Sequence, residues 1–290
     1  MQEIMRHTID KRVIREWNLI RKERLAKLEE KYEWEVKNIE LYARMALEVG
    51  IYSAVLDDES NCIKYLQRAK RAYMAYLELL AFDRVVTLEI DDNISYSFSP
   101  IFNQKGIKAS LWLRLYYLGI ILRDKAVGKF LTMIPMRKFV YPPTEEISIL
   151  LKNYIAFSYS FLEKPDLSKL EACYKITDEN KTISSYKITP ENIPYLSLFM
   201  MNHELLALKS IFEKDVDLFN EALEKSLKDH RAFWSQKRIL HAGGDPVCMD
   251  SNGFVSLPLT AICAIAYDRD FPIDHDCAYI PEFLITGEDL

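Results

Sequence analysis

The sequence predicts an all-α protein, a globule of many helices with at most one small β-hairpin near residues 84–99, and three observations support this class. Apolar residues recur at helical spacing over most of the 290 residues. Gly and Pro are scarce, at 8 and 11, whereas a sandwich or barrel needs a turn signal every few residues. Hydrophobic residues make up 49% and charged residues 28%, a balance that argues against disorder.

The N-terminal elements follow from apolar spacing and from capping residues. Residues 10–48 are expected to form one or two helices, because apolar side chains recur there every three to five positions. A further helix is expected to open after Asp57–Glu59, where acids complement the helix dipole and Ser60 can cap. Residues 84–99 partly alternate apolar and polar and predict a hairpin or extended loop. Residues 108–134 read as a central helix, apolar nearly all round in their first half.

Past the prolines at 142–143, Thr144 is expected to cap a helix with two glutamates in its first turn. Residues 164–188 are polar and weakly patterned, and we interpret them as a connecting segment. Thr189 followed by Pro190 indicates a helix start with Pro at the first helical position. Helices are then expected at about 191–213 and 216–239.

The second of these helices carries an apolar stripe from Phe219 to Trp234, which predicts that Trp234 packs against neighbouring elements. Residues 241–253 contain three glycines and a proline and are expected to form a loop. Ser256 is expected to cap a last well-formed helix at 257–267, and a short apolar turn follows at 282–285.

The domain organisation is expected to be a single, mostly helical unit over residues 1–290. The alternative is a weak division into 1–165 and 189–290, joined by the connecting segment at 164–188. No repeat of fixed length is evident.

The start of the chain has no continuous apolar stretch of the kind that a signal peptide carries. The longest apolar run, 115–122, is far shorter than the ~18 residues that a membrane span needs. Five cysteines at wide spacing, without a CxxC pair, indicate reduced thiols rather than a disulfide framework. These features predict a cytoplasmic protein with no membrane partner.

The net charge of −5 is unevenly distributed along the chain. Residues 245–290 contain nine acids and one base, a net charge of −8, so the remainder carries +3. The basic stretch at 11–27 is interleaved with glutamates, which favours a solvated helix face over a nucleic-acid site. We therefore expect no direct nucleic-acid binding, and the role of this stretch stays open.

Familiar catalytic motifs, among them the P-loop, the dinucleotide fingerprint, the nucleophile elbow and HExxH, do not occur in the sequence. Residues that could bind a metal occur in two segments near the C-terminus: His241, Asp245, Cys248 and Asp250, then His275, Asp276 and Cys277. Their spacing matches no zinc-binding pattern, and the set combines hard carboxylate ligands with soft thiol ligands. Loop turns and side-chain caps explain them better, so no metal or cofactor is expected. The acids beside Cys277 would raise rather than lower a thiol pKa, which argues against a catalytic nucleophile. His203 and His230 are expected to be satisfied core or boundary residues.

An ordered series of segments in the C-terminal third resembles the immunity protein 49 family, a group of helical proteins encoded beside polymorphic toxins in bacteria. The series consists of a helix pair split by a Lys-Asp turn at 202–234, then a loop, a Gly-Phe step and an apolar helix at 245–273, and finally YIPEFLI at 279–285. The resemblance implies a helical protein that binds and neutralises a cognate toxin and is not an enzyme.

The excess of acids in residues 245–290 suggests which part of the chain contacts such a toxin. Asp268, Asp270, Asp274 and Asp276 lie close together in the sequence between two apolar elements, and we expect them to contact a basic, nucleic-acid-acting site on the toxin. A solvated loop that maintains solubility is the alternative. Two other functions stay open: a helical-repeat regulator that binds a peptide or small ligand, and an enzyme with an unrecognised active site.

Overall fold

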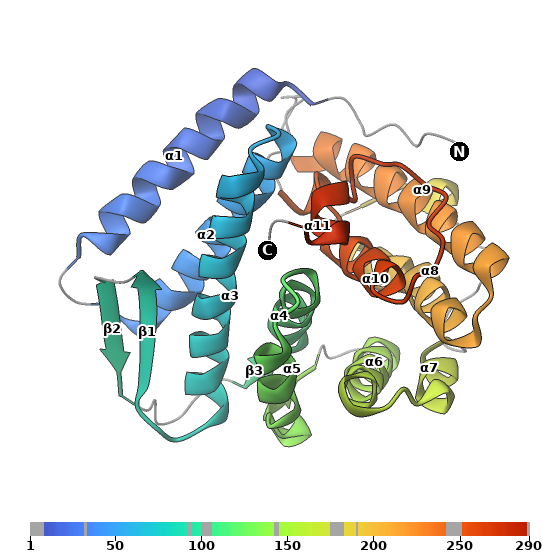
Figure 1. Ribbon diagram of the computed structural model, residues 1–290, viewed down its shortest axis with the longest axis horizontal. Coiled ribbons are helices and arrows are strands. Elements are labelled where there is room, and N and C mark those ends of the chain that lie inside the picture. Colours follow the sequence, from blue (N-terminus) through green and yellow to red (C-terminus); the bar gives the residue numbers. More distant parts are fainter. Residues whose placement is uncertain are drawn as a thin grey trace. The chain divides into compact units, whose positions relative to one another are not determined.

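The computed structural model describes residues 9–31, 34–91, 94–99, 106–141, 145–174, 183–189, 191–241 and 251–288. It is 72% helical and contains, in this described part, eleven α-helices and two very small sheets, which confirms the predicted all-α class (Figure 1). The chain divides into two compact units. Residues 10–140 form most of the N-terminal unit, and residues 141–288 form most of the C-terminal unit. The sequence-based division around 164–188 stays a prediction.

Three helices build the first half of the N-terminal unit: α1 (Lys11–Glu29), α2 (Val36–Val55) and α3 (Glu59–Ala81). Most of α2 is buried, because it packs against both α1 and α3 (Figure 1). Asp58, rather than Ser60, caps α3, since its side chain accepts a hydrogen bond from the Asn61 backbone N–H at 3.3 Å. The cap therefore lies two residues earlier than expected.

The predicted hairpin is present as β1 (Val86–Asp91) and β2 (Ile94–Phe98), which pair antiparallel. Tyr96 attaches it to the rest of the unit: its ring stacks on Trp34 at a centroid distance of 4.3 Å, and its hydroxyl donates to the Glu29 carbonyl at 2.7 Å. A second pair, β3 (Ile107–Lys108) and β4 (Phe139–Val140), is parallel and was not predicted.

The expected central helix over 108–134 is wrong in its length, because the structure has two helices there, α4 (Ala109–Ile121) and α5 (Lys125–Thr132). The break falls at Arg123, whose φ of 50° is left-handed, and at Asp124, whose side chain accepts from the Ala126 backbone N–H at 2.9 Å. The two helices then fold against each other closely. A Cβ on Gly119 would lie 2.6 Å from Val127 Cγ1, so this position requires glycine. A short 3-10 helix, η1 (Met136–Lys138), precedes β4, with which the unit ends.

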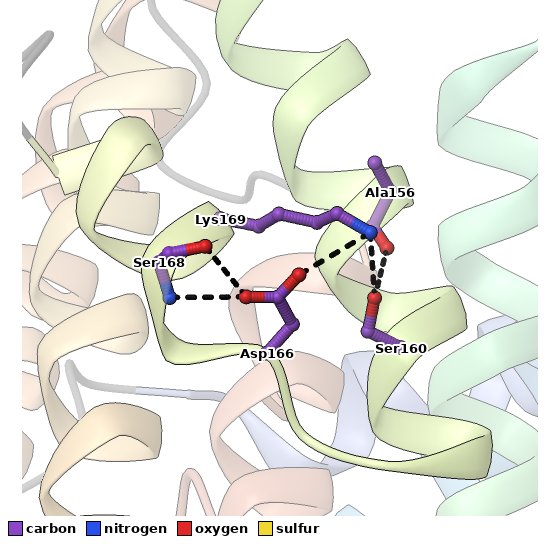
Figure 2. A network of polar contacts seen from close by, with 5 residues as sticks. All are labelled: Ala156, Ser160, Asp166, Ser168 and Lys169. Carbon is purple, nitrogen blue, oxygen red and sulfur yellow. Dashed lines mark hydrogen bonds and ion pairs between the residues drawn. The ribbon is translucent and has the colours of Figure 1, made fainter.

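The C-terminal unit begins with α6 (Glu145–Glu163) and α7 (Leu167–Tyr174). Thr144, the expected cap of α6, lies outside the described residues, and α7 occupies part of the segment interpreted as a connection. Asp166 opens α7 by accepting from the backbone N–H of Ser168 at 3.2 Å. Lys169 reaches back to donate to Ser160 Oγ on α6 at 2.9 Å, so polar contacts fix the corner between the two helices (Figure 2).

The centre of this unit is the antiparallel pair α8 (Ile193–Glu213) and α9 (Val216–His241) (Figure 1). Both were expected, but α8 starts at Ile193 rather than at Pro190, which lies outside the described residues. Asn192 precedes the helix, and its side-chain oxygen accepts from the Thr189 backbone N–H at 2.8 Å. Lys214, at a left-handed φ of 60°, ends α8 and reverses the chain into α9.

Three elements pack on this pair: η2 (Ile183–Ser185), η3 (Ser251–Gly253) and α10 (Leu257–Tyr267). The last helix, α11 (Glu282–Thr286), packs on α10. Ser256 precedes α10 as expected, but its hydroxyl makes no capping hydrogen bond, and instead its backbone N–H donates to the Tyr279 carbonyl at 2.8 Å. Trp234 is buried in a cluster with Ile183, Ile188, Leu196 and Phe233, which confirms its predicted packing.

Candidate partner-binding face

The four aspartates expected at a partner contact all lie in one stretch that joins α10 to α11, and all four side chains are exposed. We call residues 268–276 the acidic loop. Asp268 follows the last residue of α10, and Asp270, Asp274 and Asp276 lie further along. Among the described residues, Asp270, Asp274 and Asp276 form no ion pair, so their charges face solvent. That these residues contact a toxin stays a prediction.

A tight turn directs the acidic loop away from the axis of α10. Asp270 adopts a left-handed φ of 54°, a conformation that Asp tolerates better than most residues. The backbone N–H of Phe271 then donates to the Ala266 carbonyl at 2.9 Å, and that of Asp270 donates to the Tyr267 carbonyl at 3.0 Å. These bonds satisfy carbonyl groups at the end of the helix, which is how such helix ends are commonly stabilised.

After the turn, exposure alternates along the chain from residue 271 to 279. Even-numbered residues, among them Asp274 and Asp276, are exposed, whereas odd-numbered residues are half-buried or buried. This period of two is that of an extended segment with one face against the protein. Asp274 and Asp276 therefore project to the same, outer side, and His275 between them faces inward.

Asn220 on α9 holds the inner side of this segment. Its side-chain oxygen accepts from the backbone N–H of Asp274 at 2.9 Å, and its side-chain nitrogen donates to the Pro272 carbonyl at 3.3 Å. The Asn220 backbone carbonyl lies 3.0 Å from Nε2 of His275. The loop thus runs along α9 on its way to α11 (Figure 1), and its backbone is fixed rather than free.

Aromatic contacts complete the attachment. The ring of Phe271 meets Phe219 of α9 edge-on, at a centroid distance of 5.3 Å and an interplanar angle of 88°. Arg269, the single base after residue 245, places its guanidinium over Phe161 of α6 and Phe212 of α8, at 5.5 and 5.3 Å. The guanidinium keeps its charge in these contacts, so the acidic loop, with four acids and one base, carries a net charge of −3.

The late histidines and cysteines do not assemble into a reactive centre among the described residues. Asp245, Cys248 and Asp250 lie outside them, and His241 ends α9. Cys277 is buried beside Cys263, whose thiol pKa is raised by burial and by the nearby Cys277. Within the described ranges, no group of three or more His, Cys, Asp or Glu is arranged to hold a metal ion.

A buried polar cluster at the centre of the C-terminal unit was only partly anticipated. His203 of α8 and Asp229 of α9 are both buried, and His203 Nδ1 lies 2.9 Å from Asp229 Oδ2. The other oxygen of Asp229 accepts from the Ile183 backbone N–H at 2.8 Å, so this pair ties η2 to both helices. Glu204, next along α8, has its pKa raised to about 8 by burial. His203 is a buried core residue, as expected, and its Nδ1 is paired with Asp229.

Comparison with known proteins is consistent with this architecture. A family model described as Immunity protein 49 matches residues 55–284, which extends the resemblance from the C-terminal third into the N-terminal unit. No curated protein and no solved structure matches the chain significantly. None of the described helices has the length and apolar character that crossing a membrane would require.

Proposed function

Because this chain belongs to the immunity protein 49 family, we propose that it neutralises a cognate toxin by binding the toxin directly, through the acidic loop of the C-terminal unit. Family membership implies immunity against a polymorphic toxin, and the binding mode and the surface are our proposal. The observation that carries the proposal is that Asn220 holds a solvent-facing row of aspartates in place on α9.

Charge gives the contact a physical basis. Residues 245–290 carry a net charge of −8, and toxins that cut or modify nucleic acid need a basic surface to hold phosphates. An inhibitor of opposite charge associates faster with such a surface and discriminates against other partners. A loop that is already ordered also loses less conformational entropy on binding than a free one. The toxin proposed here therefore has a basic, nucleic-acid-acting site.

Binding, rather than catalysis, is the proposed mode of action. The polar groups that could act as acid or base at the centre of the C-terminal unit, His203, Glu204 and Asp229, are all buried, so a substrate would not reach their side chains without local opening. The protein would act in the cytoplasm of the cell that makes the toxin, where the toxin must be kept inactive before export.

The test is co-expression of this chain with the toxin encoded beside it. A host that makes the toxin alone should stop growing, and co-expression of this chain should restore growth. Affinity-tagged chain should also retain the toxin on a column. A toxin that still kills the host and does not co-purify with the chain would overturn the proposal, and would leave the regulator and the enzyme as the remaining alternatives.

A further inference from the structure

The N-terminal unit carries a basic hollow between α1 and α2, with a volume of about 310 Å³. We call it the basic groove. Five cations line it: Arg21, Arg24, Lys27, Lys31 and Arg44. Glu48 is the one acid among the lining residues, and its carboxylate lies 2.5 Å from Nε of Arg21, so this pair neutralises itself. Four cations remain around a single small hollow.

These four cations have no counter-ion within the part of the chain that the structure describes. Arg24, Lys27, Lys31 and Arg44 are exposed and form no ion pair with another described residue. One of the glutamates interleaved with them is directed elsewhere: Glu29 accepts from the Tyr42 hydroxyl at 2.7 Å and pairs with Arg68 at 3.0 Å. Glu29 therefore does not cancel the charge of the basic groove, although it is interleaved with these cations in the sequence.

The floor of the basic groove is apolar. Leu28 and Met45 are buried, and Leu41 is 36% exposed. The lining residues that the structure describes include no aromatic ring on which a nucleic-acid base could stack. The aliphatic floor and the cationic rim together are complementary to a protein segment that carries both acidic and apolar side chains. An amphipathic helix binds in a groove in this way, with its apolar face against the floor.

We propose that the basic groove is a second binding surface, which takes an acidic, amphipathic segment of a partner protein. Carboxylates of that segment pair with Arg24, Lys27, Lys31 and Arg44, and an apolar side chain contacts Leu28, Leu41 and Met45. All of the lining residues precede residue 55, where the family match begins. The groove belongs to the N-terminal unit and the acidic loop to the C-terminal unit, the two have opposite charges, and the groove proposal does not depend on the toxin proposal.

The test uses the full chain and a fluorescein-labelled peptide that repeats Glu-Glu-Leu-Leu, with fluorescence anisotropy as the readout. The triple variant Arg24→Gln, Lys27→Gln, Arg44→Gln should weaken peptide binding at least about tenfold at physiological salt, because it removes most of the unneutralised charge. The matched variant Arg15→Gln, Lys64→Gln, Lys125→Gln removes three exposed cations outside the groove and should change binding less than about twofold.

Two further peptides and one competitor separate the groove from general charge attraction. A peptide with Ser in place of Leu should bind more weakly, because it cannot use the apolar floor, and a peptide with Lys in place of Glu should not bind. Single-stranded DNA should not displace the acidic peptide. Equal loss of binding in both triple variants, no binding of the acidic peptide, or tighter binding of DNA would each overturn the proposal.

Discussion

Asn220 and Asp274 lie 54 residues apart in the sequence and are joined by a hydrogen bond of 2.9 Å, from the Asp274 backbone N–H to the Asn220 side-chain oxygen. The Asn220 amide nitrogen donates to the Pro272 carbonyl at 3.3 Å, so one side chain of α9 fixes two points of the acidic loop. The position of the loop's charges therefore depends on a neutral residue outside it.

Replacing Asn220 with Ala should loosen the loop. Two backbone groups would lose their partner, which typically costs ~1–3 kcal/mol, and the Asp274 amide should exchange its hydrogen faster. Urea unfolding and hydrogen exchange measure the two effects. Asn153→Ala, at a half-buried asparagine of α6, is the control and should cost less than about 0.5 kcal/mol. Unchanged protection of Asp274 in Asn220→Ala would contradict the anchoring role.

Glu204 should make stability depend on pH. Burial raises its folded-state pKa from the ordinary 4.5 to about 8. Between these values the folded carboxyl keeps its proton, while the unfolded one loses it. The contribution of Glu204 to stability is therefore present below pH 4.5 and is lost as pH rises through 8.

Glu204→Gln should remove this dependence, because Gln has a similar shape and does not ionise. Relative to the parent protein, the variant should gain stability between pH 5 and 8, on the order of 4 kcal/mol for three units of pH. Urea unfolding of both proteins at the two pH values gives the difference directly, and other titrating groups cancel in the comparison. Parallel pH dependences would show that Glu204 titrates normally.

Trp234 should contribute strongly to the stability of the C-terminal unit. It packs in a buried cluster with Ile183, Ile188 and Leu196, and a Cβ on Gly253 would lie 3.0 Å from its ring. Truncation to Ala leaves a cavity, which typically costs ~3–5 kcal/mol. Trp17→Ala, at a partly exposed tryptophan of α1, should cost clearly less in the same unfolding experiment. Equal losses would mean that Trp234 is not a core residue.

Long, regular helices could be predicted from the sequence, because their signal is repeated over many residues. The pair α8 and α9 follows directly from its apolar spacing. Local decisions were harder. The break between α4 and α5 depends on one left-handed residue, Arg123, and on one cap, Asp124, within a stretch whose apolar content favours continuation. Helix α7 has only eight residues. Its apolar stripe consists of Leu167, Leu170 and Cys173, which is too short to be recognised as a helical pattern in a polar part of the sequence.

The charge of the candidate site could be predicted from the sequence, but the contacts that hold the acidic loop in place could not. The excess of acids identifies Asp268 to Asp276, and all four aspartates are exposed. Their anchor could not be found from the sequence, because Asn220 lies on another helix and no local pattern links it to the loop. The basic groove was missed for a related reason. In the sequence, the cations of the basic groove alternate with glutamates such as Glu29. In the fold, Glu29 contacts Tyr42 and Arg68 instead of these cations.

The acidic loop should control how fast the chain associates with its toxin. In the proposed complex, Asp268, Asp270, Asp274 and Asp276 face a basic surface, so their charge attracts the toxin before contact. A variant with all four changed to Asn should associate at least about tenfold more slowly at low salt. Its rate should also depend less on salt, because screening, which limits the field to ~8 Å at physiological ionic strength, has less charge to act on.

Stopped-flow measurement of the association rate over a range of salt concentrations is the decisive experiment, with the toxin encoded beside this chain as the ligand. A second variant changes four exposed acids outside the loop, Glu89, Glu163, Glu171 and Asp217, to their amides and matches the change in net charge. If the loop is the contact, the loop variant should slow much more than this control, because attraction is strongest between charges that face each other. If both variants slow equally, net charge alone steers the encounter. If neither slows, the acidic loop is a solvated segment and the toxin binds elsewhere on the chain.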